Sequence, residues 1–562
     1  MAGDAAEQVH RLRGERHAAL LNFDSKVYQT TWSSTVTNRL LLEAGFSSSP
    51  LYATWPGQDY AANDLPGTLD AATLTYYRNT GAYWTATKRI EDFRPDSYRA
   101  AMSYVTGSHA IKTGLLYSTA EHGTFRDFHQ DLGALPLSYV TFNGTPLQAV
   151  YYAEPSPERN GYHNLGAYAQ DQWRRNRLTV NLGVRFDYLQ DYYPAQGGPP
   201  SPFVPVATNY PSKVATSWTD LSPRMGVAYD LFGNGKTALK ASANRYVLRA
   251  GNGYALAINP LETNRSNARA WTDSNGNLFP DGDPLNPNKN GELGPSTNRD
   301  FANPHINTFY DPNWALGFHK RPADWEFSTS VQHELLQGLS VNVGYFRRVY
   351  TNLELLYNQA VGANDVDYFC VTAPSNPSLP GGGGQRICGI PDLKPEKVGQ
   401  LNFITTAADN KGTRIQHWNG VDLTANARMR GILLQGGVSV GKTSVNECDL
   451  VKNTPNVLFR GTGTERIPSD YCDNITVSTV ATGSVLGGST SPWQAQVKFL
   501  GSYMLPYQVQ VSAAYQSIPG IQRTANVNFP NSVIEPSFGR HDECADQRRR
   551  ARVDIRGPDA SV

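Results

Sequence analysis

Apolar and polar residues alternate with a period of two along residues 178–188. The apolar set is Leu178, Val180, Leu182, Val184, Phe186 and Tyr188, and the residues between them are Thr179, Asn181, Gly183, Arg185 and Asp187. A strand with this pattern presents one face to an apolar medium and the other face to water. The apolar medium can be either membrane lipid or the core of a soluble sandwich. The connections between the strands distinguish these two cases.

Tight turns separate pairs of alternating segments at eight places in the sequence. They lie at 35–38, 106–108, 143–145, 174–176, 233–235, 337–338, 428–431 and 505–506. Alternating segments that flank a short turn are typical of β-hairpins. Eight hairpins predict about sixteen strands in an all-β, antiparallel fold.

Long irregular connections lie between the hairpins. Four of them are rich in Gly, Pro, Asn, Asp and Ser, namely 192–221, 249–325, 355–418 and 443–491. Compact soluble domains rarely contain irregular connections of this length. Short turns at one end and long loops at the other are typical of transmembrane β-barrels of the bacterial outer membrane. We therefore expect the turns to face the periplasm and the long loops to face outward.

Composition and charge exclude other classes. No apolar run in the 562 residues approaches the roughly 18 residues that a membrane helix needs, whereas a barrel strand needs only ~10 alternating residues. The formal net charge of +1 and the scattered basic residues argue against a nucleic-acid surface. A soluble β-propeller would show a repeat of about 40 residues, and the sequence has no such repeat.

Four of the five cysteines fall in two long connections as neighbouring pairs. Cys370 and Cys388 lie in one connection, Cys448 and Cys472 lie in another, and Cys544 is left over. Each pair predicts a loop-closing disulfide and hence an oxidising compartment. Zinc is disfavoured because no pair has metal-ligand spacing such as CxxC.

Two catalytic or nucleotide motifs occur at one place. Residues 436–443 read GGVSVGKT, which matches the phosphate-loop pattern GxxxxGK[ST] and contains GxSxG. Both motifs require a helix directly after the loop. No amphipathic helix follows Thr443, and Val438 and Val440 continue the strand alternation. We therefore predict a barrel strand here, and no enzyme.

The segment 273–283, DSNGNLFPDGD, carries closely spaced oxygen ligands. The five residues are candidate calcium ligands: Asp273, Asn275, Asn277, Asp281 and Asp283. Glu292 lies too far along the chain for the closing position of an EF-hand. The alternative is a solvated loop in which Asn, Asp and Gly favour turns.

Tyrosines gather at or near the predicted strand ends. Tyr188, Tyr192, Tyr193, Tyr345, Tyr350 and Tyr515 are candidates for interfacial girdles, because an amphipathic ring suits the lipid headgroup level. Tyrosine is also a good strand residue in general. On the polar face of the 178–188 strand, Asn181, Arg185 and Asp187 are candidate lumen-facing residues.

Four blocks of sequence resemble the barrel of TonB-dependent receptors, specifically the Oar-like group. They are 165–187 (LGAYAQDQWRRNRLTVNLGVRFD), 221–246 (LSPRMGVAYDLFGNGKTALKASANRY), 325–346 and 419–443. The resemblance extends from about Trp32 to Arg540. It implies a barrel of about 22 strands around a plug, located in outer-membrane lipid. It also implies uptake of large, scarce ligands of the oligosaccharide or peptide class, with energy delivered by the TonB complex.

The two ends of the chain depart from this resemblance. We expect residues 1–25 to be a non-family segment without signal-peptide features, 26–540 to be the barrel domain, and 541–562 to be a disordered tail. We also expect no plug or TonB segment before the first hairpin. About sixteen strands against about 22 predict a truncated, incomplete wall. The expected function is therefore that of a receptor barrel without its plug, with a passive pore or a surface-binding β protein as alternatives.

Overall fold

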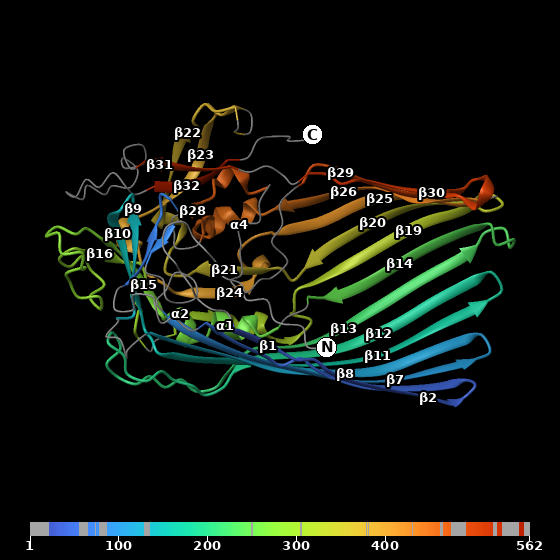
Figure 1. The fold of residues 1–562 in the computed structure, drawn as a ribbon, viewed down its shortest axis with the longest axis horizontal. Helices are drawn as coiled ribbons and strands as arrows, with labels where there is room; N and C mark the ends of the chain where they lie inside the picture. The colour runs from blue at the N-terminus through green and yellow to red at the C-terminus, as the bar shows by residue number, and fades with distance from the viewer. Residues whose placement is uncertain are drawn as a thin grey trace.

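The computed structural model describes residues 22–55, 66–73, 75–77, 87–128, 135–248, 251–303, 306–377, 379, 382–429, 431–460, 465–473, 491–520, 525–530 and 550–555. Long strands form one curved wall, and shorter elements gather at one end of it (Figure 1). The predicted all-β class is confirmed. Most of the predicted N-terminal segment and of the predicted tail, Cys544 included, lies outside the described residues.

The wall is a sheet in which 17 strands are hydrogen-bonded. Its long strands are β2 (Tyr28–Thr37), β3 (Leu40–Ser48), β7 (Thr87–Thr106), β8 (His109–Phe128), β11 (Ser156–Arg175), β12 (Leu178–Tyr193), β13 (Lys213–Asp230), β14 (Thr237–Val247), β19 (Ala323–Leu336), β20 (Leu339–Thr351), β25 (Ile415–Met429), β26 (Ile432–Asn446), β29 (Gln494–Met504) and β30 (Gln510–Ser517). The short strands β1 (Asn22–Ser25) and β4 (Leu51–Trp55) continue β2 and β3 past a break, and β18 (Leu316–Phe318) joins β13 in parallel. All other pairings of the wall are antiparallel.

Seven of the eight predicted tight turns lie together at one end of the wall, on the right in Figure 1. The register of β11 and β12 runs without a slip from Arg175 opposite Leu178 to Gly161 opposite Tyr192. The turn between these strands places Asn176 at φ +53°, a left-handed conformation that asparagine tolerates well. Alternation and local turn chemistry therefore determine these hairpins.

The predicted barrel turn at 143–145 is wrong. It joins β9 (Leu137–Phe142) to β10 (Thr145–Tyr152), which lie at the opposite end of the molecule in a separate six-stranded sheet. We call this end of the molecule the mouth and this sheet the mouth sheet. Its other strands are β5 (Gly67–Asp70), β6 (Thr75–Tyr77), β15 (Ser266–Trp271) and β16 (Leu293–Ser296). The six residues of β9 are too few to cross a bilayer, which takes about 10 residues per strand. The described wall therefore has two long strands fewer than predicted.

The described strands do not close into a ring. Among the described residues, β30 pairs only with β29, and β2 pairs only with β3. Residues 550–555 of the predicted tail form β32 (Arg550–Ile555), which pairs with β31 (Ala525–Pro530) outside the wall. The wall is thus a partial barrel with two edges, as the hairpin count predicted.

The convex and concave faces of the wall differ in chemistry. Large apolar side chains are exposed at alternate positions on neighbouring strands, including Leu115, Leu182, Val184, Phe186, Val331, Val343, Val421 and Leu423. On β12 the residues between them, Asn181, Arg185 and Asp187, lie on the opposite, inner face. Since no described residue covers the apolar band, it is the surface that contacts lipid.

An aromatic row crosses five adjacent strands on the lipid-facing side. Neighbouring ring centroids lie 5.0 to 6.3 Å apart along Phe46, Tyr98, Tyr117, His163 and Tyr192. Tyr192 was a predicted girdle residue and lies in this row. The girdle prediction is wrong for Tyr193, whose side chain is buried on the inner face. The two tyrosines are adjacent on one strand, so their side chains point to opposite sides.

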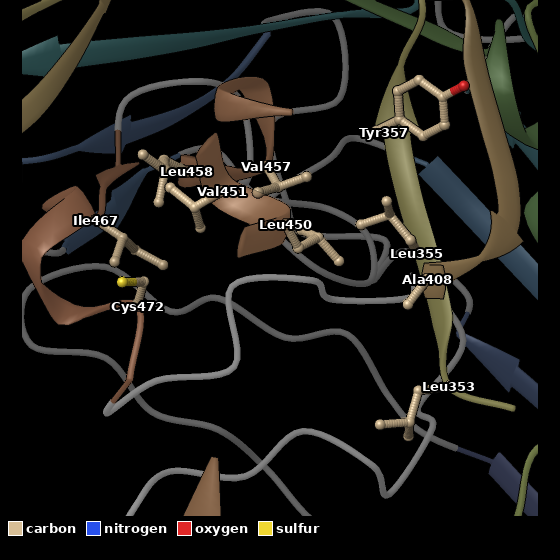
Figure 2. Packing of buried hydrophobic residues seen from close by; sticks show 10 residues of the cluster. All are labelled: Leu353, Leu355, Tyr357, Ala408, Leu450, Val451, Val457, Leu458, Ile467 and Cys472. Carbon is tan, nitrogen blue, oxygen red and sulfur yellow. The ribbon is translucent and has the colours of Figure 1, made fainter. Parts of the chain in front are cut away.

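Short elements fill the mouth end. They include α1 (Gly253–Ala257), α2 (Pro260–Thr263), β17 (Thr308–Tyr310), α3 (Pro312–Ala315), β21 (Glu354–Asn358), η3 (Ala363–Asp365), β22 (Val366–Thr372), β23 (Arg386–Leu393), η5 (Pro395–Lys397), β24 (Phe403–Ala407), η6 (Ala408–Asn410), α4 (Cys448–Asn453), η7 (Pro455–Leu458), β27 (Phe459–Arg460), β28 (Glu465–Arg466) and η8 (Ser469–Tyr471). One apolar core joins β21 to α4 and η7, with Leu355, Leu450 and Leu458 fully buried (Figure 2). No described helix has both the length and the apolar character to cross a membrane.

Candidate functional site

The connection from β14 to β19 folds back onto the inner face of the wall. We call its described residues 251–303 and 306–318 the cap. Two short helices begin in it with the same local chemistry: the Asn259 Oδ1 accepts a hydrogen bond from Leu261 N at 3.1 Å, and the Asp311 Oδ1 accepts one from Asn313 N at 2.9 Å. A proline follows each capping residue, as is favourable at the first helical position. The local sequence therefore determines where both helices begin.

An aromatic anchor holds the cap against β13. Trp218 of the wall lies 5.2 Å from both Tyr254 and Trp314 of the cap, measured between ring centroids. The Trp218 Nε1 donates to the Trp314 carbonyl at 2.9 Å, and the Tyr310 hydroxyl donates to the Tyr254 carbonyl at 2.8 Å. Trp218 is 0% exposed, so this contact excludes water. Buried aromatic contacts of this kind contribute both apolar area and specific geometry.

An ion-pair anchor holds the cap against β8 and β11. The Arg126 Nη1 lies 3.0 Å from Glu158 Oε2 of the wall and 3.1 Å from Glu262 Oε2 of the cap. Arg265 of the cap pairs with Glu154 at 3.1 Å. Burial raises the pKa of Glu154 from 4.5 to about 7, although Arg265 and Arg126 oppose the shift. Charged groups thus join the cap to the wall at a place where their desolvation is costly.

The connection between β20 and β25 also contacts the cap. β17 of the cap pairs in parallel with β24, and Thr406 Oγ1 donates to Asp311 Oδ2 at 2.7 Å. The Tyr254 hydroxyl donates to Glu354 Oε2 at 2.9 Å. Burial, together with the Glu354 carboxylate, holds the pKa of Tyr254 well above its usual value. The cap is therefore tied to the connection between β20 and β25 as well as to the wall.

The last long connection, from β26 to β29, is tied in by a buried ion pair. The Arg414 Nε lies 2.8 Å from Glu447 Oε1, and the side chains are 2% and 0% exposed. Arg414 also donates to the Glu354 carbonyl. Three separate connections therefore form one body across the mouth end of the wall.

Both predicted disulfides are confirmed. Cys370–Cys388 joins the two strands of the β22–β23 hairpin, and Cys448–Cys472 joins the start of α4 to the residue after η8. Cys472 is part of the core that packs on β21 (Figure 2). Covalent links thus hold two of the long connections in shape.

Below the mouth, the inner face of the wall is polar. A cavity of ≈ 390 Å³ is lined mainly by β25, β26 and β29, with Thr424, Asn426, Ser439, Gln496 and Lys498 among its residues. These hydroxyl, amide and ammonium groups can hydrogen-bond a polar solute.

The predicted lumen-facing residues of β12 have local partners. Asn181 Oδ1 accepts from Gln172 Nε2 at 3.1 Å. Arg185 pairs with Asp187 at 2.8 Å. They are on the predicted face, and their contacts are with the wall itself.

The phosphate-loop motif lies within a strand. Residues 432–446 form β26 without interruption, and each residue from Ile432 to Asn446 has a partner on β25. No loop exists here to hold phosphate with backbone amides. The prediction of a barrel strand is confirmed.

The candidate calcium residues lie in one exposed loop of the cap. Their oxygens accept hydrogen bonds from the loop backbone: Asp273 from Leu278 N at 3.2 Å, Asn275 from Asn277 N at 2.9 Å, Asn277 from Phe279 N at 2.7 Å, and Asp283 from Leu285 N at 2.9 Å. Asp281 Oδ2 accepts from the Asn277 side chain at 3.0 Å. In the described part of the chain, no cluster of three or more His, Cys, Asp or Glu side chains could hold a metal ion. Calcium in this loop, which would also use amide oxygens, stays a prediction.

Glu292 belongs to this loop, although it is distant from the motif in sequence. Its Oε1 accepts from Ser274 N at 2.6 Å, and its Oε2 accepts from Asp281 N at 3.3 Å. The sequence pattern missed this residue, and it also missed Arg126, Glu158 and Glu262 of the ion-pair anchor. A buried charge on a strand, such as Arg126 or Glu158, leaves no periodic signal by which it could be found, and the four-residue helix that carries Glu262 is too short for one.

No curated protein matches this sequence. Solved structures that are similar include the outer membrane transporter YddB from Escherichia coli (12% identity, TM-score 0.44, covering 95% of this chain and 55% of that chain). The ferric-catecholate import receptor Fiu from E. coli K12 (12%, 0.43, 93% and 57%) and the FrpB iron transporter from Neisseria meningitidis (9%, 0.43, 90% and 53%) are also similar.

The chain spans little more than half the length of these solved structures. The family model described as "Outer membrane beta barrel domain" matches residues 14–435. That range contains every wall strand from β2 to β25. The description of the family places this domain in the bacterial outer membrane. The chain belongs to this family of outer membrane β-barrel domains.

Proposed function

We propose that the chain is the barrel portion of an outer-membrane receptor that takes up a large, scarce solute with energy delivered by TonB. The observation that carries this proposal is the mouth: three long connections fold into one body above a polar inner wall. A barrel that only spans the membrane would not need three long connections folded together at one end. The resemblance of four sequence blocks to TonB-dependent receptors supports the same class, and we assign residues 26–540 to the barrel.

The cargo that we propose is an oligosaccharide or a peptide. The hydroxyl and amide groups of Thr424, Asn426, Ser439 and Gln496 line the inner cavity. Such uncharged polar groups exchange hydrogen bonds readily with sugar hydroxyls and peptide groups. FrpB is an iron transporter and Fiu is a ferric-catecholate import receptor, so ferric chelates serve as the comparison class of solute.

Uptake into living cells tests this proposal. Cells that display the complete receptor, of which this chain is the barrel portion, are given labelled oligosaccharides, peptides and ferric chelates, with and without a functional TonB complex. The proposal predicts TonB-dependent accumulation of an oligosaccharide or peptide. Gln496→Ala, in the cavity, should weaken it, whereas Gln332→Ala, on the inner face outside the cavity lining, should not.

A passive pore gives the opposite result. It would admit many small solutes without TonB and would carry a steady current in planar bilayers. Either finding would overturn the receptor proposal. TonB-dependent uptake of ferric chelates alone would overturn the proposed cargo class.

A further inference from the structure

The two anchors of the cap differ in how they exclude water. Trp218 and Trp314 of the aromatic anchor are 0% and 2% exposed. In the ion-pair anchor the side chains of Arg126 and Glu262 are 12% and 33% exposed. Glu154 and Glu158 of the same anchor are 0% exposed, so water reaches the ion-pair anchor at Arg126 and Glu262 and does not reach the aromatic anchor. A contact that water can enter is the one that separates more readily, since its groups regain hydration on release.

The charges in the ion-pair anchor are unevenly matched. Three carboxylates, Glu154, Glu158 and Glu262, share the guanidinium groups of Arg126 and Arg265. A single atom, Arg126 Nη1, contacts both the wall carboxylate and the cap carboxylate. Loss of this one arginine contact leaves the buried carboxylate of Glu158 facing the partly exposed carboxylate of Glu262 across the interface.

The position of α2 determines what such a release would move. Asn259, which caps α2, donates through its Nδ2 to Asn160 Oδ1 of β11 at 3.3 Å, and Ser156 Oγ of β11 donates to the Leu261 carbonyl at 3.2 Å. Beyond α2 the chain enters β15, which pairs with β10 in the mouth sheet. The other side of the cap is held by β18, which pairs with β13, and by the aromatic anchor.

We propose that the cap is a lid over the outer mouth, and that it opens at the ion-pair anchor while the aromatic anchor stays closed. α2 and the mouth sheet form the moving side. α1, α3 and β18 form the fixed side, which stays on β13. This inference rests on the proposed function, because a lid matters where a solute passes through the mouth.

Cysteine accessibility in the full-length chain tests the lid without any solute. In a Cys544→Ser background, in which the other cysteines are disulfide-bonded, one reporter is placed on each side. Leu261→Cys reports on α2, where the native side chain is 8% exposed, and Ala255→Cys reports on α1, where it is 0% exposed. A membrane-impermeant maleimide is added to the outside of intact cells, and the labelling rates are compared.

The variant Arg126→Gln removes the shared arginine and should raise the labelling rate of Leu261→Cys by tenfold or more, on the order of a 1.4 kcal/mol change. Ala255→Cys should stay protected. Glu262→Gln is the milder variant and should act in the same direction if Arg126→Gln fails to fold. Arg348→Gln is the matched control, because Arg348 is also a wall arginine with two acidic partners, Asp324 and Glu326, but it does not contact the cap.

A third reporter, Ser439→Cys, lies in the cavity below the mouth. Its labelling by a bulky maleimide should also accelerate in Arg126→Gln. Equal acceleration at Leu261→Cys and Ala255→Cys, or no acceleration at Leu261→Cys or Ser439→Cys, would overturn the lid. None of these labelling rates depends on cargo or TonB. The lid proposal can therefore be contradicted while the proposed function is supported, and the proposed function can be contradicted while the lid proposal is supported.

Discussion

The indole nitrogen of Trp218 on the barrel wall donates a hydrogen bond to the backbone carbonyl of Trp314, 96 residues further along the chain, at 2.9 Å. This contact fixes the cap at a point where neither ring is in contact with water. Because an indole nitrogen is a donor only, the carbonyl is the kind of partner that it needs when it is buried.

Truncation of Trp218 should therefore destabilise the folded chain strongly. Trp218→Ala should lower the free energy of unfolding in detergent by about 3–5 kcal/mol, since it empties a packed aromatic site. Trp493→Ala is the matched control, because Trp493 is 59% exposed, and it should cost less than about 1 kcal/mol. Urea unfolding followed by circular dichroism measures both. Equal losses would mean that the aromatic anchor does not stabilise the fold.

Adjacent residues on β12 should respond oppositely to a charge. Leu182 is 55% exposed on the apolar face, and Asn181 points to the inner face. Leu182→Arg should cost about 2–4 kcal/mol in a bilayer, because a guanidinium then enters the hydrocarbon region. Asn181→Arg should change stability little. Folding into lipid vesicles during urea titration measures the difference, and a reversed order would exchange the assignment of the two faces.

Glu154 should make the mouth less stable as pH rises. Its pKa in the folded chain, about 7, is above its ordinary value of 4.5, so the folded state binds this proton more tightly than the unfolded state. The stability that it contributes is fully present below pH 4.5 and is lost as pH rises to about 7, with a total on the order of 3 kcal/mol. Glu154→Gln should flatten this part of the stability profile.

Thermal melts across this pH range are the measurement. Glu396→Gln is a suitable control, because Glu396 is exposed and outside the anchor, and it should keep the wild-type profile. An unchanged slope in Glu154→Gln would show that this carboxyl is not the group that titrates.

The two disulfides should differ in the reach of their effects. Cys448–Cys472 closes a separation of 24 residues and belongs to the core on β21, so Cys448→Ser with Cys472→Ser should cost about 3 kcal/mol and expose several connections to protease. Cys370–Cys388 closes 18 residues within one hairpin. The corresponding serine pair should expose that hairpin alone. Mass spectrometry of limited digests identifies the cut sites, and widespread cutting in the second variant would contradict this ranking.

Calcium should protect the loop at 273–292, if the oxygen pattern at its start is a calcium site. Added Ca²⁺ should slow proteolysis of the loop and raise the melting temperature, and Asp281→Asn should remove both effects. Mg²⁺ at the same concentration is the control, because it demands a stricter octahedral shell. If neither proteolysis nor melting responds to Ca²⁺, the loop is held by its own hydrogen bonds alone.

Alternation along the sequence was sufficient to predict the wall within the membrane. It failed where the wall continues beyond the membrane. β13 begins at Lys213, inside the segment predicted as a loop, because both of its faces change character there. On the inner face, Trp218 is covered by the cap, and this apolar residue between Thr216 and Asp220 breaks the period. The local sequence pattern therefore stops predicting strands where the residues are surrounded by distant segments of the chain rather than by lipid and water.

The anchors could not be predicted for the same reason. The hydrogen bonds of Tyr254 with Glu354 and of Asn259 with Asn160 join residues 100 and 99 positions apart. The turn at 143–145 shows the converse: its hairpin was evident, but a turn does not specify which sheet its strands will join. The capping pairs before Pro260 and Pro312 were local signals that could have revealed the helices of the cap.

The mouth sheet draws its six strands from three separate connections, with β10 at the junction of β9 and β15. None of these strands can find its neighbour until the hairpins that carry it have been brought together. Pairing between such remote segments is slow, since loop-closure entropy is lost before the contacts compensate for it. The mouth should therefore be the last part of the molecule to assemble, and a chain halted during insertion would show a membrane-embedded wall with its outer end still open.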